Sequence, residues 1–162
     1  QGDGILSAGR SLMREGKATA EMKEEASLDM ARVCFDRRQL DSAYSHYNYL
    51  ATSANGEYNG EARCRQAEIL MFNQNYDRAE KIIERVARDA SSDYWLAYSF
   101  ILWADIYYAR GNNLQAKQTL QSIIDNYDVE ELLAVARQKL AAIIASEQTE
   151  TTEEQEAITI EL

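Results

Sequence analysis

Proline is absent from this 162-residue sequence, and glycine occurs only seven times. Proline interrupts helices and sheet ladders, while glycine supplies the positive backbone angles of tight β-turns. A chain with so little of either is expected to form long helices and few hairpins. Hydrophobic residues still make up 46% of the sequence, enough for a domain of this length to build a core.

Positive charge is also scarce. The sequence has 17 basic and 27 acidic residues, giving a net charge of −10. Six of the acidic residues lie in residues 147–162, which contain no basic residue, so the remainder carries a charge of −4. Because even this body would repel a phosphate backbone, we expect no nucleic-acid partner. No apolar run approaches the roughly 20 residues that cross a bilayer, so we expect no direct membrane insertion.

Few residues are suited to catalysis or metal binding. His46 is the only histidine, which excludes two-histidine zinc motifs and leaves a serine–histidine–acid triad unsupported. The acidic stretch DNYDVEE (125–131) lacks the alternating ligands and central glycine of an EF-hand, so helix-capping acids are expected there. We therefore predict no enzyme, no cofactor and no metal site. Cys34 and Cys64 are predicted to be buried free thiols and not a disulfide.

Three segments share one spacing. They are ARVCFDRRQLDSA (31–43), AEILMFNQNYDRA (67–79) and ADIYYARGNNLQA (104–116). Each begins and ends with alanine, and the segments recur at intervals of 36 and 37 residues. Self-similarity at a fixed interval of this size is typical of stacked repeats.

The spacing predicts a helix–turn–helix in each repeat. The first alanine falls within helix A and the second within helix B, where small side chains let the two backbones approach. Gly111 is expected to end helix A in a left-handed conformation, whereas Arg38 and Gln74 occupy the same place without that freedom. Helix B then continues with apolar pairs at helical spacing. These pairs are Tyr47 and Leu50, Ile83 and Val86, and Leu120 and Ile123.

The alanine register resembles the tetratricopeptide repeat (TPR), which carries small residues in both helices. Tyr107 fills a position where the family usually has an aromatic residue, but Cys34 and Leu70 stand there in the other repeats. The family's usual terminal proline is absent, and the spacing exceeds its 34 residues. The segment from Tyr94 to Tyr127 is similar to C-terminal repeats of bacterial TPR proteins of the Tol–Pal-associated and outer-membrane assembly type. Pentatricopeptide and Sel1-like repeats, or a non-repetitive bundle, are the alternatives.

The resulting architecture is an all-α solenoid of about three repeats, at about 24–57, 60–93 and 97–128. Residues 4–18 are expected to form one helix of a preceding, partial unit. Residues 129–146 are expected to form an amphipathic helix that caps the apolar side of the last repeat. The acidic tail, 147–162, is predicted to be disordered. The sequence begins Gln-Gly-Asp, without an initiator methionine, so we interpret it as a fragment of a larger protein.

The resemblance also implies a partner-binding groove along the A helices. Two apolar rows flank a charged row there, and apolar rows on a surface indicate contact with another molecule, unless a curled chain or a homodimer covers them. The implied groove residues are Leu28, Arg32, Phe35, Cys64, Glu68, Met71, Tyr98, Ile101, Asp105 and Tyr108. A receptor for chaperone tails is not expected, because only Arg32 and Arg65 would supply positive charge to the family's carboxylate clamp.

The expected function is therefore that of a non-catalytic protein-interaction scaffold, which binds a peptide or helix of a partner in the helix A groove. The alternative is a structural or self-association module within a longer envelope-associated TPR protein. A periplasmic or envelope-associated location follows only from the family resemblance. The identity of a partner does not follow from any residue in the sequence.

Overall fold

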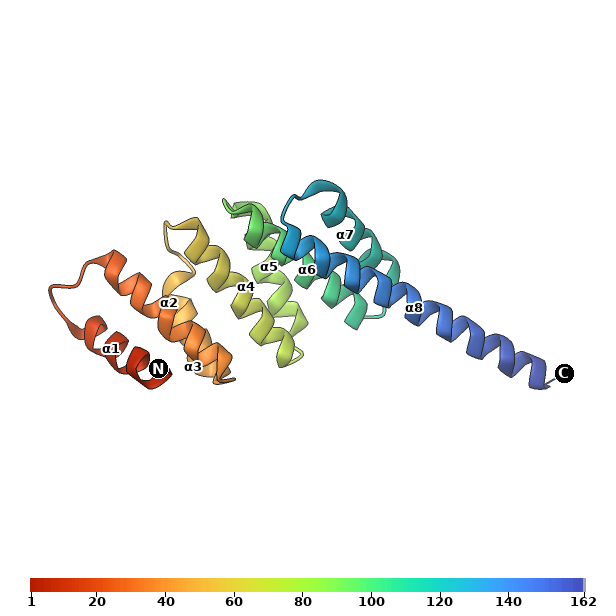
Figure 1. The fold of residues 1–162 in the computed structure, drawn as a ribbon, viewed down its shortest axis with the longest axis horizontal. Coiled ribbons are helices and arrows are strands. Elements are labelled where there is room, and N and C mark those ends of the chain that lie inside the picture. Colours follow the sequence, from red (N-terminus) through yellow and green to blue (C-terminus); the bar gives the residue numbers. More distant parts are fainter. Residues whose placement is uncertain (162) are drawn as a thin grey trace. The chain divides into compact units, whose positions relative to one another are not determined.

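The computed structural model describes residues 1–161, and all of the regular structure in that range is helical. The helices follow one another along the chain (Figure 1). They are α1 (Gly2–Arg14), α2 (Ala20–Asp36), α3 (Leu40–Leu50), α4 (Gly56–Phe72), α5 (Tyr76–Asp89), α6 (Asp93–Ala109), α7 (Asn113–Asn126) and α8 (Glu130–Glu161). The predicted all-α fold class is confirmed, and the helices pack in neighbouring pairs, as in an α-solenoid.

The chain divides into two compact units. Unit 1 comprises Gln1–Ser99 and unit 2 comprises Phe100–Leu162, so the boundary falls within α6. In unit 1, α2 packs against α1 and α3, and α4 packs against α3 and α5. In unit 2, α7 packs against α8. The three A helices, α2, α4 and α6, each have 17 residues.

The alanine register corresponds to the most tightly buried positions of the helices. All six predicted alanines are at most 1% exposed: Ala31, Ala43, Ala67, Ala79, Ala104 and Ala116. The predicted apolar pairs of helix B are equally buried. Since a methyl group is the largest side chain that leaves such backbones close together, the spacing predicted the packing positions correctly.

Each helix A joins its helix B through the same turn. The middle residue is left-handed in all three cases, with φ of 60° at Arg38, 58° at Gln74 and 78° at Gly111. The next amide closes the turn by donating to a carbonyl five residues earlier, at 2.8–2.9 Å: Gln39 to Cys34, Asn75 to Leu70, and Asn112 to Tyr107. This pattern is the Schellman motif, which satisfies carbonyls at a helix end. Arg38 and Gln74 adopt it despite their Cβ atoms.

Helices also cover both ends of the repeat array. The predicted helix at 4–18 corresponds to α1, whose Gly9 lies so close to Met30 that an added Cβ would meet the methionine sulfur at 2.6 Å. The predicted cap at 129–146 corresponds to the first half of α8, which buries Leu132, Leu133 and Ile143. Cys34 and Cys64 are buried and free, as predicted.

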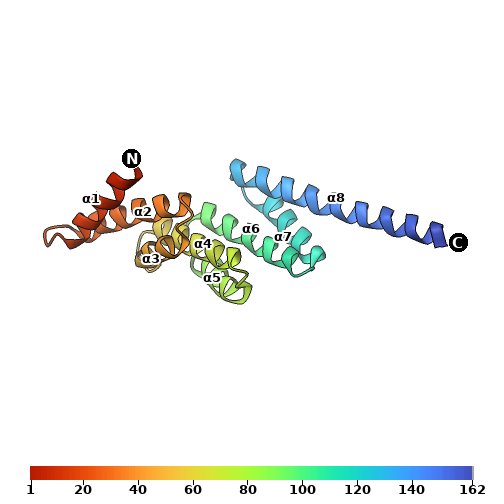
Figure 2. The ribbon, with the colours of Figure 1, turned by 90° about the horizontal axis from the view of Figure 1, so that it is seen from below.

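The prediction of a disordered tail at 147–162 was wrong over the described part of that segment. Helix α8 continues through it to Glu161, although every side chain from Gln148 onward is exposed (Figure 2). The segment contains no glycine or proline, and it extends a helix already formed, so it incurs no nucleation cost. Four threonine hydroxyls donate to carbonyls four residues earlier, from Thr149, Thr151, Thr152 and Thr159. Leu162 lies outside the described residues.

Candidate protein-interaction surface

One of the two predicted apolar rows is not on a surface. Leu28, Cys64 and Ile101 are all buried, with exposures of 6%, 0% and 4%. The thiol of Cys64 donates to the carbonyl of Trp95 at 3.5 Å, and burial raises its pKa well above the ordinary value. These three residues therefore belong to the packing between helices, and a partner could not contact them in the folded chain.

The second row is more accessible, but it is shared between the units. Phe35 and Met71 lie half-buried in unit 1, whereas Tyr108 is 43% exposed in unit 2. The charged row is likewise divided, because Asp105 lies in unit 2. Its carboxylate accepts from Lys139 Nζ at 3.0 and 3.1 Å, and burial raises its pKa in spite of that lysine.

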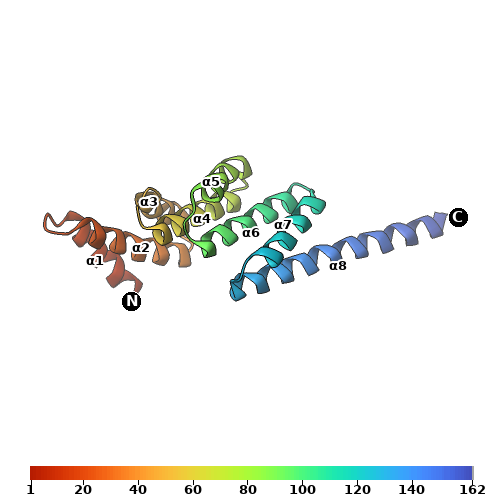
Figure 3. The same cartoon turned by 90° about the horizontal axis from the view of Figure 1, so that it is seen from above.

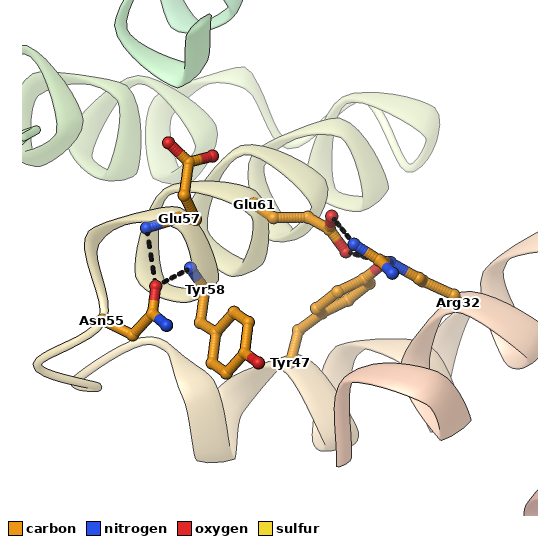
Figure 4. A network of polar contacts seen from close by, with 6 residues as sticks. All are labelled: Arg32, Tyr47, Asn55, Glu57, Tyr58 and Glu61. Carbon is orange, nitrogen blue, oxygen red and sulfur yellow. Dashed lines mark hydrogen bonds and ion pairs between the residues drawn. The ribbon is translucent and has the colours of Figure 1, made fainter. Parts of the chain in front are cut away.

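In unit 1, the charged row begins with a bidentate ion pair (Figure 4). Arg32 on α2 donates through Nε and Nη2 to the carboxylate of Glu61 on α4, at 2.9 and 2.7 Å. Glu61 is buried and also accepts from the hydroxyl of Tyr47 at 3.4 Å, while the Arg32 side chain remains 54% exposed. The hydrogen bonds that Arg32 donates to Glu61 raise the pKa of Arg32, and burial together with the charge of Glu61 raises the pKa of Tyr47. Sequence reasoning missed Glu61 as the partner of Arg32.

The position of Glu61 depends on how α4 begins. Asn55 caps that helix, its side-chain oxygen accepting from the amides of Glu57 and Tyr58 at 3.0 and 3.2 Å (Figure 4). Such a cap fixes the first turn, and Glu61 lies one and a half turns further along the helix. Helix α4 begins at Gly56, directly after this cap.

Another arginine of unit 1, Arg65 on α4, lies close to three aromatic rings. The guanidinium carbon of Arg65 lies 4.8 Å from the ring centre of Phe35, 5.4 Å from Tyr98 and 5.9 Å from Trp95. Its Nη1 donates to Glu68 at 3.0 Å and to the Tyr98 hydroxyl at 2.9 Å. Burial disfavours the charged form of Arg65, but the oxygens of Tyr98 and Glu68 favour that form more strongly. The pKa of Arg65 is therefore raised. The structure thus brings together Phe35, Glu68 and Tyr98 of the predicted set around an arginine that the prediction did not include.

Beside this arginine lies an exposed aromatic ring that the sequence did not single out. Phe72, the last residue of α4, is 52% exposed, and its ring centre is 6.5 Å from that of Phe35. The guanidinium carbon of Arg38 lies 5.3 Å from the ring centre of Phe72. Two arginines and two phenylalanines therefore form one surface. We call Phe35, Arg38, Arg65 and Phe72 the Phe72 patch. The only sequence signal was an apolar residue at the very end of a helix, where a core position was not required.

Residues 1–161 contain no group of three or more histidine, cysteine or carboxylate side chains placed to hold a metal ion. Burial lowers the pKa of His46, and its backbone carbonyl accepts from the Ser27 hydroxyl at 2.9 Å. Within the same range, no helix combines the length and the apolar character required to cross a membrane.

Comparisons with known proteins do not extend these observations. No family model, curated protein or solved structure matches the chain.

Proposed function

We propose that this chain is a TPR-like, non-catalytic scaffold that binds a segment of a partner protein through the Phe72 patch of unit 1. The observation that carries the proposal is the 52% exposure of Phe72 between Arg38 and the Phe35–Arg65 pair. Aromatic residues and arginine dominate the energetics of protein interfaces, because they combine large contact area with directed polar groups.

The charges around the patch favour an amphipathic segment as the ligand. Arg32 and Arg65 already face carboxylates of the same chain, so neither is a free clamp for a terminal carboxylate. Arg38 contributes a positive charge above an apolar ring. A segment with an apolar anchor and a nearby acidic residue would satisfy both features of the patch. The family resemblance makes an envelope-associated partner the first class to test.

The patch can be tested by crosslinking followed by titration. A photoreactive amino acid in place of Phe72 is expected to trap the partner, whereas the same group in place of Tyr49 is not. Tyr49 is a suitable control because it is 44% exposed on α3 and belongs to no part of the patch. Once the partner is identified, Phe72→Ala is expected to weaken its binding about tenfold or more, and Tyr49→Ala about twofold at most.

Circular dichroism of both variants serves as the folding control. Equal crosslinking from both positions, or normal binding by a folded Phe72→Ala variant, would contradict the proposal. In that case the exposed Tyr108 of unit 2, which was predicted to line the groove, becomes the next residue to test.

A further inference from the structure

A basic groove lies on unit 1, and none of its lining residues belongs to the Phe72 patch. It has a volume of about 700 Å³ and is formed by α3, α4 and α5. Its lining residues are Tyr44, Asn48, Ala51, Thr52, Arg63, Gln66, Arg78, Lys81, Ile82 and Arg85. Four of these are basic and none is acidic, in a protein whose net charge is −10.

The cations of this groove are largely unneutralised. Arg78, Lys81 and Arg85 are exposed on one side of α5 and make no ion pair within residues 1–161. Arg63 donates to the carbonyl of Ala51 at 3.0 Å and reaches Asp89 only at 3.9 Å. Like charges gathered without partners repel each other, so an anionic occupant would stabilise the groove.

The described part of the tail presents the opposite charge. No lysine or arginine follows Lys139, and the residues from Glu150 to Glu161 are all exposed. On a helix, Glu150, Glu153, Glu154 and Glu161 share one face, which also carries Ile158 at 60% exposure. Glu147 differs from them, because it is already paired with Lys117 at 2.7 Å.

The segment that carries this acidic face is expected to form a helix poorly on its own. Glutamates spaced three and four residues apart repel each other, and the segment has no basic residue to relieve that repulsion. The cations from Arg78 to Arg85 extend over roughly 10 Å of α5, while Glu150 to Glu161 extend over roughly 16 Å of α8. The signs are therefore complementary, the acidic face is long enough to cover the three cations of α5, and Ile158 has an apolar counterpart in Ile82 of the groove.

We propose that the acidic face of α8, from Glu150 to Glu161, docks in the α3–α4–α5 groove of a second copy of this chain. Helix α8 is continuous and runs past the ends of α6 and α7 of its own unit (Figure 3). It presents this face without a partner in that unit. Each copy carries both a donor face and an acceptor groove, so the contact is heterologous and leads to reciprocal dimers or to short chains.

The contact is small and mainly electrostatic. Three turns of helix bury less area than a standard stable interface, so association is weak and concentration-dependent. Exposed charges are screened by salt, so the association constant is expected to fall at least about tenfold between ionic strengths of about 0.05 M and 0.5 M.

Sedimentation equilibrium of the full chain tests this directly. The groove-reversed variant carries Arg78→Glu, Lys81→Glu and Arg85→Glu, and the tail-reversed variant carries Glu150→Lys, Glu153→Lys and Glu154→Lys. Each variant alone is expected to be monomeric at concentrations where the unaltered chain associates. An equimolar mixture of the two is expected to associate again, because each provides the charge that the other has lost.

A matched control keeps the effect of net charge separate from that of the groove. The variant Arg10→Glu, Arg14→Glu, Lys17→Glu changes the net charge by the same amount as the groove reversal, at exposed positions near the start of the chain. It is expected to associate like the unaltered chain, and circular dichroism checks that all variants fold. Neither reversal alters the Phe72 patch, so loss of self-association with normal partner crosslinking would separate the two proposals.

Three results would overturn the inference. The first is an unaltered chain that stays monomeric at low salt over the whole concentration range. The second is self-association that neither reversal reduces, or that the mixture does not restore. The third is a monomer that binds a short single-stranded oligonucleotide through Arg78, Lys81 and Arg85, which would assign the groove to nucleic acid.

Discussion

Charged side chains pair on the A helices of unit 1, whereas stacked aromatic rings line the part of α6 that lies in unit 2. In unit 1, Arg32 on α2 pairs with Glu61 on α4, and Arg65 pairs with Glu68 within α4. In unit 2, the ring of Trp103 stacks on Phe100 at 6.3 Å and on Tyr107 at 6.2 Å, with interplanar angles of 4° and 12°. These rings and α7 line a groove of about 520 Å³.

Both units nevertheless share the alanine register and the turn. The backbone approach of paired helices is set by the small residues, and the closing hydrogen bond is made by the backbone itself. Side chains outside these positions are free to differ, because they do not determine how close the helices lie. The small residues and the turns thus determine how the helices pack in both units, while the other side chains give each unit a different surface.

The largest expected effect comes from truncating the core of one unit at a time. Ile83→Ala in unit 1 and Leu120→Ala in unit 2 should each cost about 2–5 kcal/mol, since both side chains are at most 1% exposed. The two tryptophans provide one reporter for each unit, Trp95 in unit 1 and Trp103 in unit 2. In single-tryptophan variants, urea unfolding should shift most at the reporter of the truncated unit. Equal shifts at both reporters would show that the units unfold together.

Overpacking the alanine register tests what the units have in common. Ala67→Leu and Ala104→Leu should each destabilise by about 1–3 kcal/mol, because neither site has room for a larger side chain. Ala109→Leu is the control, since Ala109 is exposed on the same helix as Ala104. A melting midpoint unchanged by Ala104→Leu would mean that the register is wrong in unit 2.

Glycine should be the more stable residue at the left-handed turn position in both units. Arg38→Gly and Gln74→Gly are expected to stabilise unit 1 by up to about 1 kcal/mol each, because glycine adopts positive φ without a Cβ clash. Gly111→Ala should destabilise unit 2 by about 1 kcal/mol for the same reason. Asn73→Gly is the control, as its φ of −88° offers no strain to relieve, so it should only destabilise. Thermal melts would measure all four.

The smallest expected effect is a pH dependence of unit 1 below pH 6.5, because unit 1 contains the only histidine of the sequence. Burial lowers the pKa of His46 below its ordinary value of 6.5, so the fold favours neutral imidazole. Its contribution to stability is complete above pH 6.5 and is lost as the pH falls through the lowered value. Unfolding of unit 1 monitored by Trp95 should therefore become easier on acidification, and His46→Gln should reduce this trend. An identical slope in the variant would assign the pH dependence to other groups.

The fold was predictable wherever backbone geometry or helix periodicity restricts which side chains fit. The six alanines and Gly111 fall in this class, and so do the apolar pairs of helix B, because a helix repeats its buried face at fixed intervals. The expected groove was less predictable. Register places Leu28, Cys64 and Ile101 on one helix face, but only the packing of neighbouring helices determines whether that face is covered.

The tail was misjudged for a different reason. Composition indicated too little apolar area for independent folding, yet the segment inherits its conformation from the packed first half of α8. The exposure of Phe72 and the burial of Glu61 were not predicted either, because both depend on which neighbouring helices cover the side chain. Whether the accessible residues of the predicted groove, Phe35, Met71 and Tyr108, contact a partner stays a prediction.

Helix α8 also has a mechanical consequence. Ile143 is the last of its buried anchors, and the 18 residues from there to Glu161 extend roughly 27 Å beyond it. A helix of that length acts as a lever, so a tilt of only about 10° at Ile143 would move Glu161 by roughly 5 Å. Repacking a single side chain at Ile143 would thus redirect the six glutamates that follow it on α8, with no change in their sequence.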